Sequence, residues 1–124
     1  MKFYISGRTA KISEIKEMTE VLTTMGHVVS HDWTEDRDVD LPRPYEENKA
    51  SQIASKEVRG ISDADIFIII GDSAGTGMYV ELGVALATNT KVYSIGAYND
   101  ITVFHFLPNV TRFNTFSEVL EDLE

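Results

Sequence analysis

A short apolar run, a glycine-rich loop and an apolar helix constrain this chain more than any other stretch. Residues 66–70 read IFIII, a run too short for a helix and typical of a strand buried on both faces. Small residues dominate the loop 71–77, and residues 78–87 are apolar apart from Glu81. This order of strand, loop and buried helix indicates an α/β protein with a covered parallel sheet.

Glu81 is the one charge of that helix, and an unpaired buried carboxylate is costly. A capping-box role fails, because the residue three positions earlier is Met78, which cannot cap. A structural salt bridge stays open as an explanation. We favour a functional carboxylate near a helix N-terminus, where the helix dipole stabilises the ionised form and where open α/β sheets bind ligands.

The rest of the chain predicts further strands and helices on either side of this stretch. Strands are expected at 2–6, 27–30, 91–95 and 111–113, and helices at 10–25, 45–61 and 115–123. Gly26 suits the end of the first helix, and Thr115 with Glu118 forms a capping box for the last. An acidic loop with two prolines separates the second strand from the second helix, and 96–109 is a loop or short helix. We predict one flavodoxin-like, Rossmann-like three-layer α/β domain over 1–124, with about five parallel strands in the order 2-1-3-4-5.

The amino-acid composition argues against several classes of function. The net charge of −9, from 20 acidic against 11 basic residues, argues against binding nucleic-acid polymers or anionic membranes. The lack of cysteine excludes disulfides and thiolate catalysis. No signal peptide or long apolar span is apparent, so we expect a cytoplasmic protein. The three histidines, His27, His31 and His105, lack the spacing of a metal site, and no metal or cofactor is implied.

Four strand ends should meet at one edge of the sheet. They carry 7–9, Asp32 with Trp33, 72–77, and Gly96. Trp33 either stacks on a nucleobase or serves as a core or rim aromatic, and the two readings are equally good. Asp32 and Asp72 are expected to form turns or caps.

Three motifs resemble the nucleoside 2-deoxyribosyltransferase superfamily, which includes the 2′-deoxynucleoside 5′-monophosphate N-glycosidases. They are FYISG at 3–7, SDADIF at 62–67 and GTGMYVELGVALA at 75–87. The order of elements matches over nearly the whole chain. The DWT motif at 32–34 and FHFLP at 104–108 are similar to small, poorly characterised bacterial members.

The resemblance implies cleavage or transfer at the N-glycosidic bond of a (deoxy)nucleoside or its 5′-monophosphate, through an oxocarbenium-like transition state. Glu81 matches the nucleophile, Tyr4 the tyrosine that orients it, and Asp65 the acid that assists at the sugar or the leaving base. Spacing alone does not place Asp65 in the site. Gly7 matches a glycine that lets the backbone approach the ligand, and Gly77 would bring loop amides to the sugar or phosphate.

Two positions depart from the family pattern and leave the substrate open. Gly75 stands where the transferases have an aspartate and the monophosphate hydrolases a serine, so Ser73, Thr76 or Arg8 would have to contact a phosphate. Tyr79 stands where a small residue is usual and would narrow the pocket or move the base.

The alternative is a non-catalytic module that binds or senses a nucleotide on the same fold. A dinucleotide-binding oxidoreductase is disfavoured, because the loop has two of the three expected glycines and follows the third strand. The resemblance also implies a homodimer or larger assembly. Phe104, Phe106 and Leu107 are more often core residues, but if exposed they would make a dimer contact.

Overall fold

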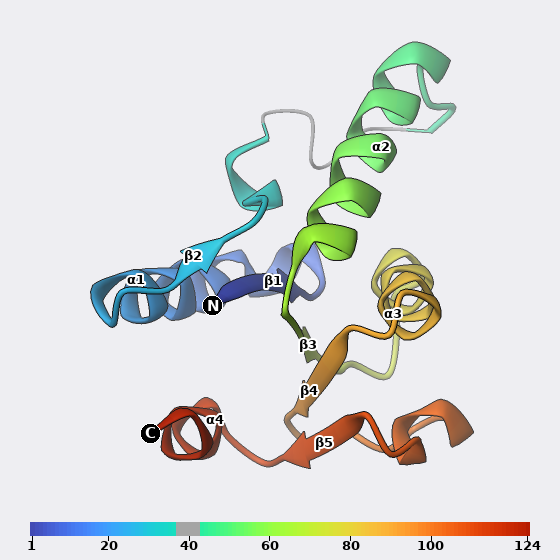
Figure 1. Cartoon of the computed structure of the whole chain (residues 1–124). Coiled ribbons are helices and arrows are strands. Elements are labelled where there is room, and N and C mark those ends of the chain that lie inside the picture. The colour runs from blue at the N-terminus through green and yellow to red at the C-terminus, as the bar shows by residue number, and fades with distance from the viewer. Residues whose placement is uncertain (37–42) are drawn as a thin grey trace.

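The computed structural model describes residues 1–36 and 43–124. Its strands form one parallel sheet in the order β2-β1-β3-β4-β5, which confirms the predicted topology (Figure 1). The strands are β1 Lys2–Ser6, β2 Val28–Val29, β3 Ile66–Ile70, β4 Lys91–Ile95 and β5 Val110–Phe113.

Helices cover both faces of this sheet. In Figure 1, α1 and α4 lie on one side of the strands, and α2 and α3 lie on the other. The helices are α1 Ile12–Thr24, α2 Glu47–Asp63, α3 Gly77–Ala87 and α4 Phe116–Leu123. Short 3-10 turns are η1 Thr9–Lys11, η2 Trp33–Glu35 and η3 Val103–Phe106. The three-layer prediction is therefore confirmed.

The central strand β3 explains why the sheet needs cover on both faces. All five of its side chains are buried, and β1 and β4 flank it in parallel register. Apolar side chains on alternate faces of β3 must each meet a helix layer. The carboxyl ends of β1, β3 and β4 consequently share one edge, next to the start of α3.

Two helix boundaries differ from the sequence prediction for local reasons. The segment expected as one helix over 10–25 is divided, because Lys11, the last residue of η1, has dihedrals outside the α-helical region. The helix expected from residue 45 begins at Glu47, because the Glu46 carboxylate accepts the backbone N–H groups of Asn48 and Lys49. That interaction is an N-cap. Part of the predicted acidic loop, 37–42, lies outside the described residues.

Two predictions of helix ends are confirmed. Gly26 follows α1 with φ +93°, a conformation that glycine adopts without strain. Thr115 caps α4 by accepting the backbone N–H of Glu118 at 3.3 Å. The second strand is shorter than expected, since only two of its residues pair with β1.

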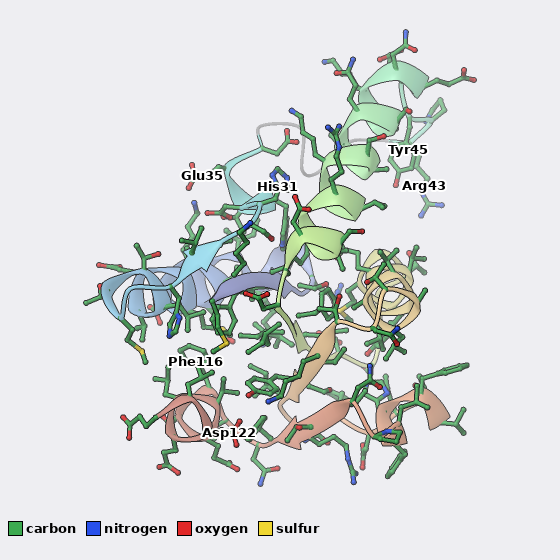
Figure 2. The ribbon with its side chains drawn as sticks, in the orientation of Figure 1. His31, Glu35, Arg43, Tyr45, Phe116 and Asp122 are labelled. Atoms are coloured by element: carbon green, nitrogen blue, oxygen red, sulfur yellow. The ribbon has the colours of Figure 1, made fainter. Side chains whose placement is uncertain are left out.

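The outer half of α2 extends beyond the sheet. Figure 2 shows Arg43 and Tyr45 near its outer end, away from the strands, and Tyr45 is 55% exposed. Only the last turns of α2 are buried, at Gly60 and Ile61. The helix therefore packs on the sheet through its C-terminal part. Within 1–36 and 43–124, no helix is both long and apolar enough to cross a membrane.

Candidate active site

Glu81 receives a hydrogen bond on each oxygen of its carboxylate. The Tyr4 hydroxyl donates to Oε2 at 2.6 Å, and the Ser6 hydroxyl donates to Oε1 at 2.7 Å. Residues two apart on a strand point to the same face, so β1 presents both hydroxyls to α3. Tyr4 and Ser6 are themselves fully buried. Sequence analysis named Tyr4 and Glu81 but missed Ser6.

Glu57, on α2, is a second carboxyl group in this cluster and hydrogen-bonds to Glu81. The sequence carries a signal that could have found it. Ile53, Glu57 and Ile61 are spaced four apart, so Glu57 lies on the apolar stripe of its helix. An acid at a core-facing helix position is the same anomaly that singled out Glu81.

The two carboxyl groups titrate together, and their surroundings favour the neutral form of one of them. Burial raises the pKa of Glu57 to about 7, with a further contribution from the charge of Glu81. Burial also raises the pKa of Glu81, while the hydrogen bonds from Tyr4, Ser6 and Glu57 oppose that rise. The pKa of Tyr4 is raised, first by burial and then by Glu81, so its phenol stays a donor. Near neutral pH Glu57 therefore carries a proton for a large part of the time.

A cavity of about 130 Å³ opens onto both carboxyl groups. Trp33 forms one wall: it is 6% exposed, and its indole Nε1–H donates to the Ile5 carbonyl at 2.7 Å. Trp33 is therefore both a core aromatic and a wall of the site. The cavity is lined by Gly7, Thr9, Trp33, Glu57, Gly77, Met78 and Glu81.

A second cavity of about 210 Å³ lies beside the first, at the N-terminus of α3. Gly75 has φ +107°, and a Cβ there would lie 3.2 Å from Arg8 Cγ, so the stem of Arg8 occupies the space next to this glycine. The guanidinium lies 3.5 Å from the Asp72 carboxylate. This cavity is lined by Gly7, Arg8, Thr9, Gly75, Thr76, Gly77 and Met78.

Tyr79 does not narrow either cavity. Its hydroxyl donates to the Asp72 carbonyl at 2.6 Å and accepts the Asp72 backbone N–H at 3.2 Å, which fixes the loop before α3. The Asp72 carboxylate accepts the Ala74 N–H at 3.2 Å, so the prediction that Asp72 is a cap is confirmed. Asp32 likewise caps η2 by accepting the Thr34 N–H. Ser73 is exposed and lines neither cavity.

Asp65 lies at the amino-terminal end of the strands, whereas Glu81 lies at their carboxyl-terminal end. It is exposed, directly before β3, and its carboxylate accepts the Lys2 backbone N–H at 2.8 Å. At about 3.3 Å per residue, β3 separates it from the Ile70 end by roughly 16 Å. The expectation that Asp65 lies beside Glu81 is therefore wrong. Glu57 is the acid that the fold brings to Glu81.

Of the two placements considered for the aromatic segment, core or exposed, the structure shows the exposed one. Phe104 is 57% and Phe106 59% exposed, and Val80 on α3 is 69% exposed. Phe104 lines an apolar groove of about 550 Å³ between α3 and η3, and Val80 and Phe106 stand on those same two elements. The groove is lined by Tyr79, Leu82, Gly83, Leu86, Ala87, Thr102, Phe104 and Leu107. His105 is buried beneath it, with Nδ1 accepting the Thr102 N–H.

Among the described residues, no group of three or more acidic or histidine side chains is arranged to hold a metal ion. The site offers carboxyl groups, hydroxyl groups, one arginine and a helix N-terminus. That set suits nucleophilic and acid–base chemistry on a small polar molecule.

Solved structures share the fold over nearly the whole chain. The CMP N-glycosidase BcmB of Clostridium botulinum superposes with a TM-score of 0.66 at 19% identity, over 99% of this chain and 98% of that one. A 2-deoxyribosyltransferase of Bacillus psychrosaccharolyticus superposes with a TM-score of 0.75 at 18% identity, over 96% and 90%. A search of curated proteins finds no significant match. The family model for nucleoside 2-deoxyribosyltransferase matches residues 4–110, and the chain belongs to that family.

Proposed function

We propose that this protein cleaves or transfers at the N-glycosidic bond of a (deoxy)nucleoside or its 5′-monophosphate. The observation that carries the proposal is the coupled pair Glu57 and Glu81 at one cavity, with Tyr4 bound to Glu81. The membership of the chain in a nucleoside-processing family supports the same chemistry. So do the names of the two structural neighbours, one an N-glycosidase and one a deoxyribosyltransferase.

In the first step, Glu81 acts on C1′ of the sugar while the base departs. The bond from C1′ to the base nitrogen breaks, and a bond to a Glu81 oxygen forms, or the carboxylate stabilises the oxocarbenium ion. Glu57, with a pKa of about 7, is protonated often enough near neutral pH to give its proton to the leaving base. We assign to Glu57 the role that the family resemblance had suggested for Asp65.

In the second step, water or a second base attacks C1′. The acceptor gives its proton to the Glu57 carboxylate, and the bond to Glu81 breaks, which restores both groups. Water as the acceptor makes the protein a hydrolase, and a second base makes it a transferase.

The two adjoining cavities suggest how a substrate lies. We place the base and sugar between Trp33 and the carboxyl groups, in the smaller cavity. A 5′-phosphate would extend into the larger cavity, where Arg8, Thr76 and the amides at the start of α3 are available. Ser73 lies outside it. A cytoplasmic location would suit a substrate of this kind.

We also propose that the chain forms a homodimer through the apolar groove and its exposed rim. Apart from Glu81, which is turned into the site, α3 carries no charge. Two molecules of net charge −9 can approach each other there without bringing acidic side chains together. Exposed apolar patches of this kind mark interaction surfaces.

The second candidate is a nucleotide-binding or sensing module without turnover. Two features favour it: both oxygens of Glu81 already accept hydrogen bonds, and Gly75 replaces the family's polar side chain.

Chromatographic detection of free base, after incubation with a panel of nucleosides and 5′-monophosphates, separates these candidates. We expect base release by the wild type and a loss of at least about 100-fold in Glu81→Gln. Samples with a second free base distinguish exchange from hydrolysis. If nothing on the panel is cleaved, yet a nucleotide raises the melting temperature, the binding module is correct and the enzymatic proposal is wrong.

A further inference from the structure

We propose that Ser6 is a positioning residue that keeps Glu81 ionised and thereby places the shared proton of the pair on Glu57. The inference rests on the proposed roles of Glu81 as nucleophile and Glu57 as acid. It adds a physical reason why one of two glutamates acts as the nucleophile and the other as the acid.

The geometry divides the donors unequally between the two carboxyl groups. Glu81 accepts one hydroxyl on each oxygen, Tyr4 on Oε2 and Ser6 on Oε1. A carboxylate accepts at both oxygens, whereas a protonated carboxyl group must also place its own O–H hydrogen. Protonation of Oε1 would make that oxygen a weaker acceptor for the Ser6 hydroxyl, so the hydrogen bond favours the ionised form of Glu81. Because Ser6 is fully buried, its hydroxyl could not turn to solvent instead.

The acidic groups that act on the pair do not supply this bias. Glu57 on α2 is influenced by Glu81 and by Asp36, and Tyr4 on β1 by Glu81, Glu57 and Asp32. In the described part of the chain, these neighbours are acids, which favour a proton somewhere in the cluster without deciding where it lies. The two hydroxyl donors act on Glu81 and not on Glu57, and the N-terminus of α3 favours the ionised form of Glu81 in the same direction. The family pattern already gives Tyr4 the role of orienting Glu81. Ser6 is the second hydroxyl donor to Glu81, and that pattern gives it no role.

Removing the Ser6 hydroxyl should move the proton toward Glu81. In Ser6→Ala we expect kcat to fall about 10- to 100-fold, the range for a lost hydrogen bond to a charged group, with KM nearly unchanged. The acidic limb of the pH–rate profile should move to higher pH and the basic limb to lower pH, because the nucleophile becomes harder to ionise and the acid easier. Ser6→Thr keeps the hydroxyl and should restore the wild-type profile.

Ser94 provides a matched control. Ser6 on β1 and Ser94 on β4 are both fully buried and both pair in register with Ile69 of β3. The Ser94 hydroxyl donates to the Asn99 carbonyl rather than to a carboxylate. Ser94→Ala removes an equivalent buried hydroxyl from the same level of the sheet and should leave both limbs of the profile in place.

The decisive measurement is a ¹³C NMR titration of the glutamate side-chain carboxyl groups, with Glu57→Gln and Glu81→Gln used for assignment. In Ser6→Ala we expect the pKa of Glu81 to rise and that of Glu57 to fall, with no change in Ser94→Ala and wild-type behaviour in Ser6→Thr. Ser6→Cys, a weaker donor of similar size, should be intermediate and serves if the alanine variant does not fold. Identical titration curves in wild type and Ser6→Ala or Ser6→Cys overturn the proposal. Because the titration needs no substrate, it decides the role of Ser6 even if the base-release panel shows no enzymatic activity.

Discussion

Gly60 of α2 lies directly against the aromatic ring of Tyr4. A Cβ at residue 60 would lie 3.2 Å from Cδ2 and Cε2 of that ring and 2.6 Å from Cβ of His31. Figure 2 shows His31 between the end of β2 and α2. The missing side chain lets α2 approach β1 closely, and Glu57 lies one turn earlier on the same helix. Gly60 thus sets the distance at which Glu57 meets Glu81.

Gly60→Ala should therefore destabilise the protein, although alanine favours helices by about 1 kcal/mol. The crowded contact costs up to about 3 kcal/mol, so we expect a net loss of up to about 2 kcal/mol in urea unfolding. Gly83→Ala is the control, because no atom lies within 4 Å of a Cβ there. Measured where the chain is monomeric, it should stabilise the protein slightly, and equal effects at both positions would contradict the close-packing argument.

Tyr4→Phe leaves the ring in place and removes the donor to Glu81 Oε2. A hydrogen bond to a charged group contributes about 1.5–3 kcal/mol, so kcat should fall about 10- to 100-fold. Base release under saturating substrate measures this. An unchanged kcat would mean that Tyr4 serves packing alone.

Glu57 should make stability depend on pH in a defined window. Its pKa is 4.5 in the unfolded chain and about 7 in the fold, so the folded form binds its proton more tightly. The stabilisation is complete below about pH 4.5 and is lost as the pH rises through about 7. After allowance for the solvent that reaches this half-buried group, the loss is about 1–2 kcal/mol. Urea unfolding across this range should show a flatter pH dependence in Glu57→Gln than in wild type.

Tyr79→Phe should loosen the loop that precedes α3, because the hydroxyl holds both backbone groups of Asp72. We expect a loss of about 1–2 kcal/mol in stability and a larger effect on KM than on kcat, since the loop lines the larger cavity. Tyr98→Phe, at an exposed tyrosine whose backbone packs on Gly71, should change neither quantity. If Tyr79→Phe alters only kcat, the loop assignment is wrong.

Val80→Glu should weaken the proposed dimer by placing a charge beside the apolar groove. We expect the apparent mass in analytical ultracentrifugation to fall to that of one chain, because two buried like charges would face each other across a symmetric interface. Lys91→Glu, on an exposed residue of β4, is the control and should leave the assembly unchanged. A monomeric wild type would exclude the homodimer.

The sequence predicted the sheet order because strand periodicity and the buried run at β3 are strong local signals. It predicted Glu81 for a similar reason, since a charge in an apolar helix has few explanations. Asp65 was misplaced because its position relative to β3 is ambiguous in sequence. The hydrogen bond from the Lys2 backbone N–H shows that Asp65 lies at the end of the sheet where β1 and β3 begin.

Ser6 and Glu57 were missed for a different reason. A serine in a strand is ordinary in isolation, and Glu57, although it lies on the apolar stripe of its helix, is one of many charges in a polar helix. Their contacts with Glu81 join segments far apart in the chain. The role of Tyr79 was also hidden, because sequence gives its position on α3 but not the direction of its ring, which turns toward Asp72.

Tyr4, Ser6 and Glu57, which act on Glu81, stand on β1 and α2. Trp33 stands on the short turn η2, and Arg8, Gly75 and Thr76 stand on loops that precede η1 and α3. Under the proposed function, bond cleavage and substrate recognition would therefore fall to separable parts of the chain. A mutant library confined to the connecting segments could change which nucleoside is accepted while leaving the reactive cluster intact, and this architecture is a starting point for engineering new substrate preferences.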